Sequence, residues 1–222
     1  MIKKVQDIAI LFFTRTAAQE AEAKKWTSIP ELDYQIASVL INRTRESLQK
    51  APFPVFQIDG KSQSGHSFGD RLSNAFKLIF DKGYRYVVAI GNDCQNLNLN
   101  WLKIQNELKT RNVVLGPDLR GGVYLLGISS DQDYCRKFNL ISWNTDLVFD
   151  QLKHLFHNHY TAEYRRDINT NEDLRFDLHL LKLIKTYFLK DSWQSANEIL
   201  TDRNLNLYQS LRAPPTILLS PK

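Results

Sequence analysis

Residues 86–93, Tyr-Val-Val-Ala-Ile-Gly-Asn-Asp, decide the fold class of this chain. An unbroken apolar run of this length is typical of a strand buried on both faces, because a half-exposed strand would alternate apolar and polar residues. The run stops at Gly91, and a carboxylate follows at Asp93. Ligands of open α/β sheets bind outside the carboxyl ends of the strands. The stretch therefore predicts a buried strand that ends at a ligand-binding edge.

The rest of the chain alternates strand-like and helix-like segments. Apolar runs predict further strands at residues 8–13, 55–58, 113–115 and 123–128, and an edge strand within 160–168. Apolar residues at helical spacing predict helices from Pro30, near Phe68 to Ile79, over 101–108, 146–157 and 172–190, and a final helix within 191–208. This alternation predicts an α/β fold with a central, mostly parallel mixed sheet between two layers of helices.

The domain boundaries follow from length and composition. The 222 residues suit one domain, which we place at residues 1–212, with a loose tail at 213–222 that contains Pro214-Pro215. Residues 14–29 are polar and rich in alanine. We expect them to form a long connection whose part from Thr16 to Lys25 is a loop that is mobile without ligand and orders over phosphates when a ligand binds.

Charge and cysteine content exclude several classes of function. The net charge is +5, but basic residues are scattered among acids, which argues against nucleic-acid binding and leaves a solvated surface or a phosphate pocket. Cys94 and Cys135 form no CxxC pair, which predicts neither a zinc finger nor a disulfide framework. Gln6 and Asp7 interrupt the amino-terminal apolar run, and no segment has transmembrane length. We therefore expect a cytoplasmic protein.

Acidic and glycine-rich segments are the candidates for chemistry. Asp93 could bind a divalent cation or cap the next helix, and the sequence leaves both open. Thr170 and Asp173 match a capping box, which leaves Asp167 as a second metal ligand or a phosphate-site acid. The adjacent Gly121 and Gly122 indicate either close approach to a ligand or a tight turn.

Three histidines look like a metal site, but only two of them share a helix face, and no acid or cysteine completes a ligand set. We interpret them as a solvated helix end; they are His154, His157 and His159.

Five motifs in order resemble a bacterial family. It is an uncharacterised glycosyltransferase-like family of the GT-A, nucleotide-diphospho-sugar transferase superfamily, with members described as arsenosugar-biosynthesis or radical-SAM-associated transferases. The motifs are Leu11-Phe12-Phe13-Thr14-Arg15; Phe68-Gly69-Asp70-Arg71-Leu72 with Ala75-Phe76; Gly91-Asn92-Asp93; Gly116-Pro117 with Gly121-Gly122-Val123-Tyr124-Leu125-Leu126-Gly127; and Asp167 to Leu174.

The chain also departs from this family. Residues 16–26 lack the glycine and proline of the family's basic loop, and only Lys24 and Lys25 could replace its basic pair. Gln95 stands where proline is usual, Arg120 where an aspartate precedes Gly-Gly, and Asn169 where a second aspartate is common.

The resemblance implies a GT-A fold and a metal-dependent nucleotide-sugar glycosyltransferase or nucleotidyltransferase, with donor and acceptor unknown and no catalytic residue assigned. It implies Mg²⁺ or Mn²⁺ at Asp93 and Asp167. It implies that phosphate oxygens are contacted by Arg15, Lys24 and Lys25, and by Arg71 unless that residue forms a surface ion pair instead. It also implies a loop that contacts the donor or the acceptor, with Asp118, Arg120, Gly121 and Gly122.

Two questions stay open. The departures also fit a degenerate, non-catalytic nucleotide-binding or interaction module of the same fold. Arg120 could pair with Asp118 or bind an anion.

Overall fold

The computed structural model describes residues 7–94 and 97–189. In these ranges six strands form one sheet: β1 (Ile8–Phe13), β2 (Val55–Ile58), β3 (Tyr86–Ile90), β4 (Val113–Pro117), β5 (Val123–Ser129) and β6 (Tyr160–Thr161). The named helices are α1 (Ala17–Lys24), α2 (Pro30–Gln49), α3 (Phe68–Phe80), α4 (Trp101–Arg111), α5 (Tyr134–Phe138), α6 (Val148–Leu155) and α7 (Asn171–Leu174).

The sheet has the strand order β2-β1-β3-β5-β4-β6. β1 pairs in parallel with β2 and β3, and β4 pairs in parallel with β6. β5 is antiparallel to both of its neighbours, so it alone among these strands runs in the opposite direction. The order of the first three strands reverses between β1 and β3, which makes their carboxyl ends the topological switch point. The predicted mixed, mostly parallel sheet is confirmed.

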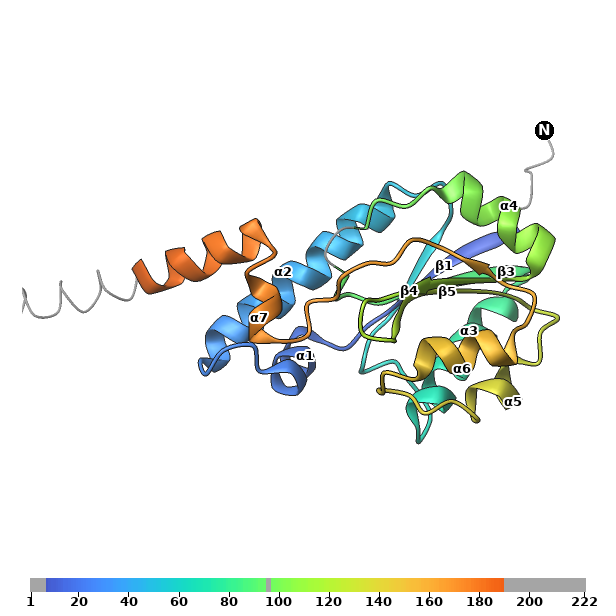
Figure 1. Cartoon of the computed structure of the whole chain (residues 1–222), viewed down its shortest axis with the longest axis horizontal. Coiled ribbons are helices and arrows are strands. Elements are labelled where there is room, and N and C mark those ends of the chain that lie inside the picture. The colour runs from blue at the N-terminus through green and yellow to red at the C-terminus, as the bar shows by residue number, and fades with distance from the viewer. Residues whose placement is uncertain (1–6, 95–96, 190–222) are drawn as a thin grey trace, which may run out of the picture. The chain divides into compact units, whose positions relative to one another are not determined.

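The apolar runs are strands buried on both faces. Along β1, Ala9, Leu11 and Phe13 face the cluster formed with α3, α5 and α6, while Ile8, Ile10 and Phe12 face the cluster beside α2 and α4. Figure 1 shows α3, α5 and α6 together on one side of the sheet and α4 on the other. The predicted three layers are confirmed.

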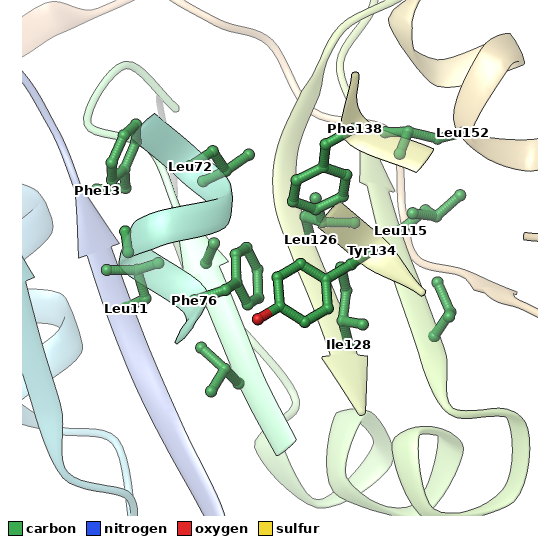
Figure 2. Close-up of a cluster of buried hydrophobic side chains, with 14 of the residues drawn as sticks. Leu11, Phe13, Leu72, Phe76, Leu115, Leu126, Ile128, Tyr134, Phe138 and Leu152 are labelled. Carbon is green, nitrogen blue, oxygen red and sulfur yellow. The ribbon is translucent and has the colours of Figure 1, made fainter. Parts of the chain in front are cut away.

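Aromatic residues fill the core under α3 and α5. The ring of Phe76 lies 5.8 Å from the ring of Tyr134 and 5.7 Å from that of Phe138. Figure 2 shows these rings between α3 and the strand residues Leu126 and Ile128. Helix α5, which supplies two of the rings, has no counterpart in the sequence prediction.

The segment after β1 corrects one expectation. Residues expected to form a loop make helix α1, which begins with a reciprocal capping box between Thr16 and Gln19. The helix ends at Lys24 and is capped by Lys25, whose φ of 48° is left-handed, and Trp26 is then buried with only 1% of its surface exposed. Its indole Nε1 donates to the carbonyl of Ile168 at 3.0 Å. The expected ordering of this segment by ligand stays a prediction.

The last described segment divides into two helices. The apolar stripe over 172–190 predicts one helix, but α7 ends at Leu174, and a second helix covers 178–189 after a turn. Residues up to Asp177 belong to one compact unit, and the helical residues 178–189 belong to another. The capping box at α7 is confirmed, and α6 is shorter than predicted.

Some predictions reach beyond the described residues. The helix within 191–208, the tail at 213–222 and the carboxyl end of the single domain at 1–212 lie outside them. Among the residues that the structure describes, no helix has the length and apolar character needed to cross a membrane.

Candidate functional site

A cleft of about 670 Å³ lies at the carboxyl ends of β1 and β3. The amino end of β5 lies at the same edge because this strand runs in the opposite direction. Helix α1 and the connection between α5 and α6 also line the cleft. Most predicted site residues line it: Arg15, Lys24, Arg71, Asp93, Asp118, Arg120, Gly122 and Asp167. Lys25 and Gly121 are not among the lining residues.

A buried hydrogen bond joins the ends of the two central strands. The hydroxyl of Thr14 donates to Oδ1 of Asn92 at 2.9 Å, and the hydroxyl of Thr44 donates to the carbonyl of Asn92 at 3.3 Å. Both Thr14 and Asn92 are buried. These bonds fix the backbone immediately before Asp93, so its carboxylate is presented to the cleft from a rigid strand end.

Lys24 is the central cation of the cleft. Its Nζ lies 3.1 Å from Oδ2 of Asp93 and 3.8 Å from Oε1 of Glu20, and it also donates to Oδ1 of Asn169. Glu20 in turn accepts from Nη1 of Arg15 at 3.2 Å. The Lys24 side chain is only 17% exposed. Helix α1 therefore places the ammonium group of Lys24 at the switch point of the sheet.

Asp167 is a buried carboxyl group beside two other acids. An isolated antiparallel bridge joins it to Cys94, and the amide of Ile168 donates to the carbonyl of Asp93 at 2.9 Å. Its Oδ1 is buried and has no hydrogen-bond partner among the residues that the structure describes. Burial, followed by the charges of Asp93 and Asp118, raises the pKa of Asp167 to about 9. Such a group holds a proton or requires a nearby cation at neutral pH.

Asp118 organises the turn between β4 and β5. Its Oδ1 accepts from the amide of Arg120 at 2.6 Å and from the amide of Gly122 at 3.0 Å. A Cβ at Gly122 would lie 2.2 Å from Oδ2 of Asp118, so a side chain at this position would displace the carboxylate. Asp118 therefore acts first as the acceptor that closes the turn.

Gly121 lies against the backbone of another segment of the chain, at Asp146. Its φ is +88°, and a Cβ there would lie 1.9 Å from the carbonyl oxygen of Asp146. Its own carbonyl accepts from the amide of Phe149 at 2.8 Å. This glycine therefore holds the β4–β5 turn against the connection that enters α6.

Arg120 takes a partner that neither sequence interpretation considered. Its Nη2 lies 2.7 Å from Oδ1 of Asp173, whose side chain is 1% exposed. Only its backbone amide contacts Asp118. The guanidinium thus joins the β4–β5 turn to the start of α7, and the ion pair with Asp118, one of the two alternatives, is not formed. Anion binding at the same residue stays a prediction.

The remaining predicted positions have separate surroundings. Arg71 donates to the carbonyl of His66 at 3.4 Å, and the described residues give it no acidic partner. The rings of His154 and His157 lie 5.6 Å apart. Within the described ranges no group of three or more histidine, cysteine or acidic residues is arranged to hold a metal.

Sequence reasoning missed one wall of the cleft. Phe68 and Trp143 line it, with ring centroids 5.0 Å apart, and Asn144, Thr145 and Asp146 follow in the same connection. This connection has no strand or helix pattern of its own. The Phe68-Gly69 pair belongs to one of the sequence motifs, but nothing in the sequence indicates Trp143 as its partner.

Part of the chain is similar in sequence to one bacterial family. Residues 43–145 match a family described as an uncharacterized protein conserved in bacteria, DUF2064. Among curated proteins, no sequence matches the chain.

One solved structure shows the fold, and a second is similar at a lower score. A protein from Desulfovibrio desulfuricans G20, described as a candidate nucleotide-diphospho-sugar transferase, aligns with a TM-score of 0.67 and 19% identity, over 82% of this chain and 99% of that one. A glycosyltransferase involved in glycosylation of the major capsid of PBCV-1 aligns with a TM-score of 0.41 and 11% identity, over 70% of this chain and 82% of that one. The chain is an α/β protein with the fold of the first of these structures.

Proposed function

We propose that the cleft binds a nucleoside diphosphate-sugar together with a divalent cation and that the protein transfers a group from it. The observation that carries the proposal is the convergence of Lys24 and Arg15 with Asp93 and Asp167 at the switch point of the sheet. A diphosphate needs positive charge on its oxygens in both the bound state and the transition state. The fold of the Desulfovibrio protein supports the same ligand class.

The acids of the cleft fit a divalent cation. Mg²⁺ usually takes one or two carboxylates and completes its shell with water and substrate phosphates, so a set of three protein ligands is not required. Asp93 and Asp167 would hold it, and Oδ1 of Asp167 is a buried oxygen without a hydrogen bond to the described residues. The cation would neutralise the leaving diphosphate.

Lys24 would exchange partners when the ligand binds. Its ammonium now neutralises Asp93, and a cation at that carboxylate makes this role redundant. The diphosphate oxygens then offer Lys24 a new anionic partner on the same side of the cleft. Arg15 is 45% exposed and can reach the phosphates without leaving a buried site.

A thermal-shift panel tests the ligand class. Nucleoside mono- and diphosphates and nucleoside diphosphate-sugars would be added with Mg²⁺, with Mn²⁺ or with EDTA. A ligand present at 100 times its Kd stabilises the native state by about 2.7 kcal/mol, which is several degrees for a domain of this size. We expect the shift only with a diphosphate and a divalent cation. If no nucleotide raises the melting temperature under any of these conditions, the proposal fails.

Release of nucleoside diphosphate from the diphosphate-sugar that binds separates catalysis from binding alone. Asp131→Asn is the matched control for aspartate-to-asparagine variants of the cleft, since Asp131 is exposed and does not line the cleft. A diphosphate-sugar that binds but is never consumed with any acceptor would identify the degenerate, non-catalytic module.

A further inference from the structure

Two glycines hold the connection between α5 and α6 against the cleft. A Cβ at Gly69 would lie 2.8 Å from Nε1 of Trp143, and a Cβ at Gly121 would lie 1.9 Å from the carbonyl oxygen of Asp146. Both ends of the segment 143–146 therefore touch positions where any side chain would push it away. The segment therefore forms part of the wall of the cleft.

The first residue of this segment presents a fixed aromatic surface. Nε1 of Trp143 donates to the carbonyl of Phe138 at 2.8 Å, and the ring packs 5.0 Å from Phe68 and 5.4 Å from Phe138. The indole nitrogen is thus already satisfied. What the ring offers to the cleft is apolar surface, which suits a flat or apolar group.

The last residue of the segment is an acid with a distinctive environment. Among the carboxylates that line the cleft, Glu20 and Asp93 pair with cations, Asp118 closes a turn and Asp167 is buried. Asp146 is exposed and has no hydrogen bond or ion pair to the described residues. It is therefore the lining carboxylate whose acceptor capacity is free.

We propose that residues 143–146 and Phe68 form the acceptor subsite, which takes a neutral hydroxyl compound bearing an apolar ring rather than a phosphate. The inference rests on the proposed function and specifies its second substrate. Trp143 and Phe68 would pack against the apolar group. The negative charge of Asp146 disfavours a phosphorylated acceptor and favours a hydroxyl that donates to it.

The chemical step balances with groups already named. The acceptor oxygen forms a bond to the anomeric carbon of the donor sugar while the bond from that carbon to the diphosphate oxygen breaks. The electron pair of the broken bond leaves with the diphosphate, which keeps its contacts to Lys24 and Arg15. The acceptor proton passes to the carboxylate of Asp146, which later releases it to water.

Calorimetry tests the subsite without knowledge of the natural acceptor. The protein would be saturated with Mg²⁺ and the nucleoside diphosphate that gives the largest thermal shift. Phenyl β-glucoside, methyl β-glucoside and glucose 1-phosphate would then be titrated in turn. We expect phenyl glucoside to bind about tenfold more tightly than methyl glucoside, because one aromatic contact is of this size. Equal affinities, or tightest binding of glucose 1-phosphate, would overturn the proposal.

Variants assign the preference to the segment. Trp143→Ala should abolish the tenfold preference while the Kd of the nucleoside diphosphate stays within about twofold. Trp143→Leu serves if the alanine variant does not fold. Asp146→Asn should strengthen glucose 1-phosphate binding severalfold, and Asp150→Asn, on the exposed side of α6, should not. A preference that survives both tryptophan substitutions contradicts the aromatic subsite.

Turnover tests the role of Asp146. With the matching diphosphate-sugar as donor, phenyl glucoside should stimulate release of nucleoside diphosphate, and Asp146→Asn should lower that stimulated rate by about 100-fold. No stimulation in the parent protein, or an unchanged rate in the variant, refutes the proton transfer. Nucleotide binding itself would persist in either case, so these failures remain distinct from failure of the proposed function.

Discussion

Replacing Asp167 by Asn should stabilise the metal-free protein at neutral pH. The folded state raises the pKa of this carboxyl group from 3.8 to about 9, chiefly through burial and then through Asp93 and Asp118. In the unfolded chain the group ionises above its ordinary pKa. Between the two values the folded protein must therefore keep a proton that the unfolded chain releases, which opposes folding.

The size of the effect follows from the two pKa values. For each pH unit above the pKa of the unfolded chain, retention of the proton lowers the free energy of unfolding by about 1.4 kcal/mol. The loss is about 4 kcal/mol at pH 7 and continues to rise until the pH reaches the pKa of the folded state. Below pH 4 the term vanishes, since both states bind the proton. Asparagine has the same shape, cannot ionise, and can donate its amide to Asp118 as the protonated acid does. We expect a gain of at least about 2 kcal/mol at pH 7 after local relaxation.

Urea unfolding in EDTA at pH 5, 6, 7 and 8 measures this gain. The difference between Asp167→Asn and the parent should widen by about 1.4 kcal/mol for each pH unit. Asp131→Asn, at an exposed position, serves as the control and should show no such trend. A difference that stays constant with pH would refute the reasoning, because it would mean that Asp167 is ionised in the folded protein throughout this range.

Three further perturbations follow from the site. Arg120→Ala should destabilise the protein by about 2 kcal/mol, measured by urea unfolding, because it leaves the buried Asp173 carboxylate without its closest cation; an unchanged midpoint contradicts this. Gly121→Ala should cost more than about 2 kcal/mol, since its Cβ would overlap the carbonyl of Asp146 at a positive φ, and near-wild-type stability refutes the contact. Lys24→Met should weaken nucleoside diphosphate binding at least about tenfold by calorimetry, with nucleoside binding unchanged; equal affinities would remove Lys24 from the phosphate site.

Strands and the longer helices could be predicted because their signal is local. β1 and β3 are unbroken apolar runs, and α2 begins at a proline in its first turn. Helix α1 was missed because alanine, glutamate and lysine leave no apolar stripe. A signal was present in Thr16 and Gln19, which form a capping box three residues apart.

The break after α7 could not be predicted from periodicity. The leucine pattern continues through it, and the turn lies where Asp177 is buried and pairs with Arg43 of α2. That pair joins positions far apart in the sequence. No local pattern encodes such a contact, so the sequence favoured one continuous helix.

The candidate site was predicted in part for the same reason. Asp93 follows a buried strand, and this placement alone directed it to the ligand-binding edge. The meeting of Asp167 with Cys94 and the pairing of Arg120 with Asp173 are tertiary contacts. The aromatic wall at Trp143 depends on the close approach that Gly69 permits, which is visible only in three dimensions.

Calorimetry of one ligand tests the central claim most directly. The nucleoside diphosphate selected by thermal shift would be titrated into the parent protein and into Asp93→Asn, each with Mg²⁺ and with EDTA. The account predicts that Mg²⁺ strengthens binding to the parent at least about tenfold and has little effect on the variant, because the cation bridges Asp93 and the diphosphate. Identical Mg²⁺ dependence in the two proteins, or no binding to the parent, would contradict it.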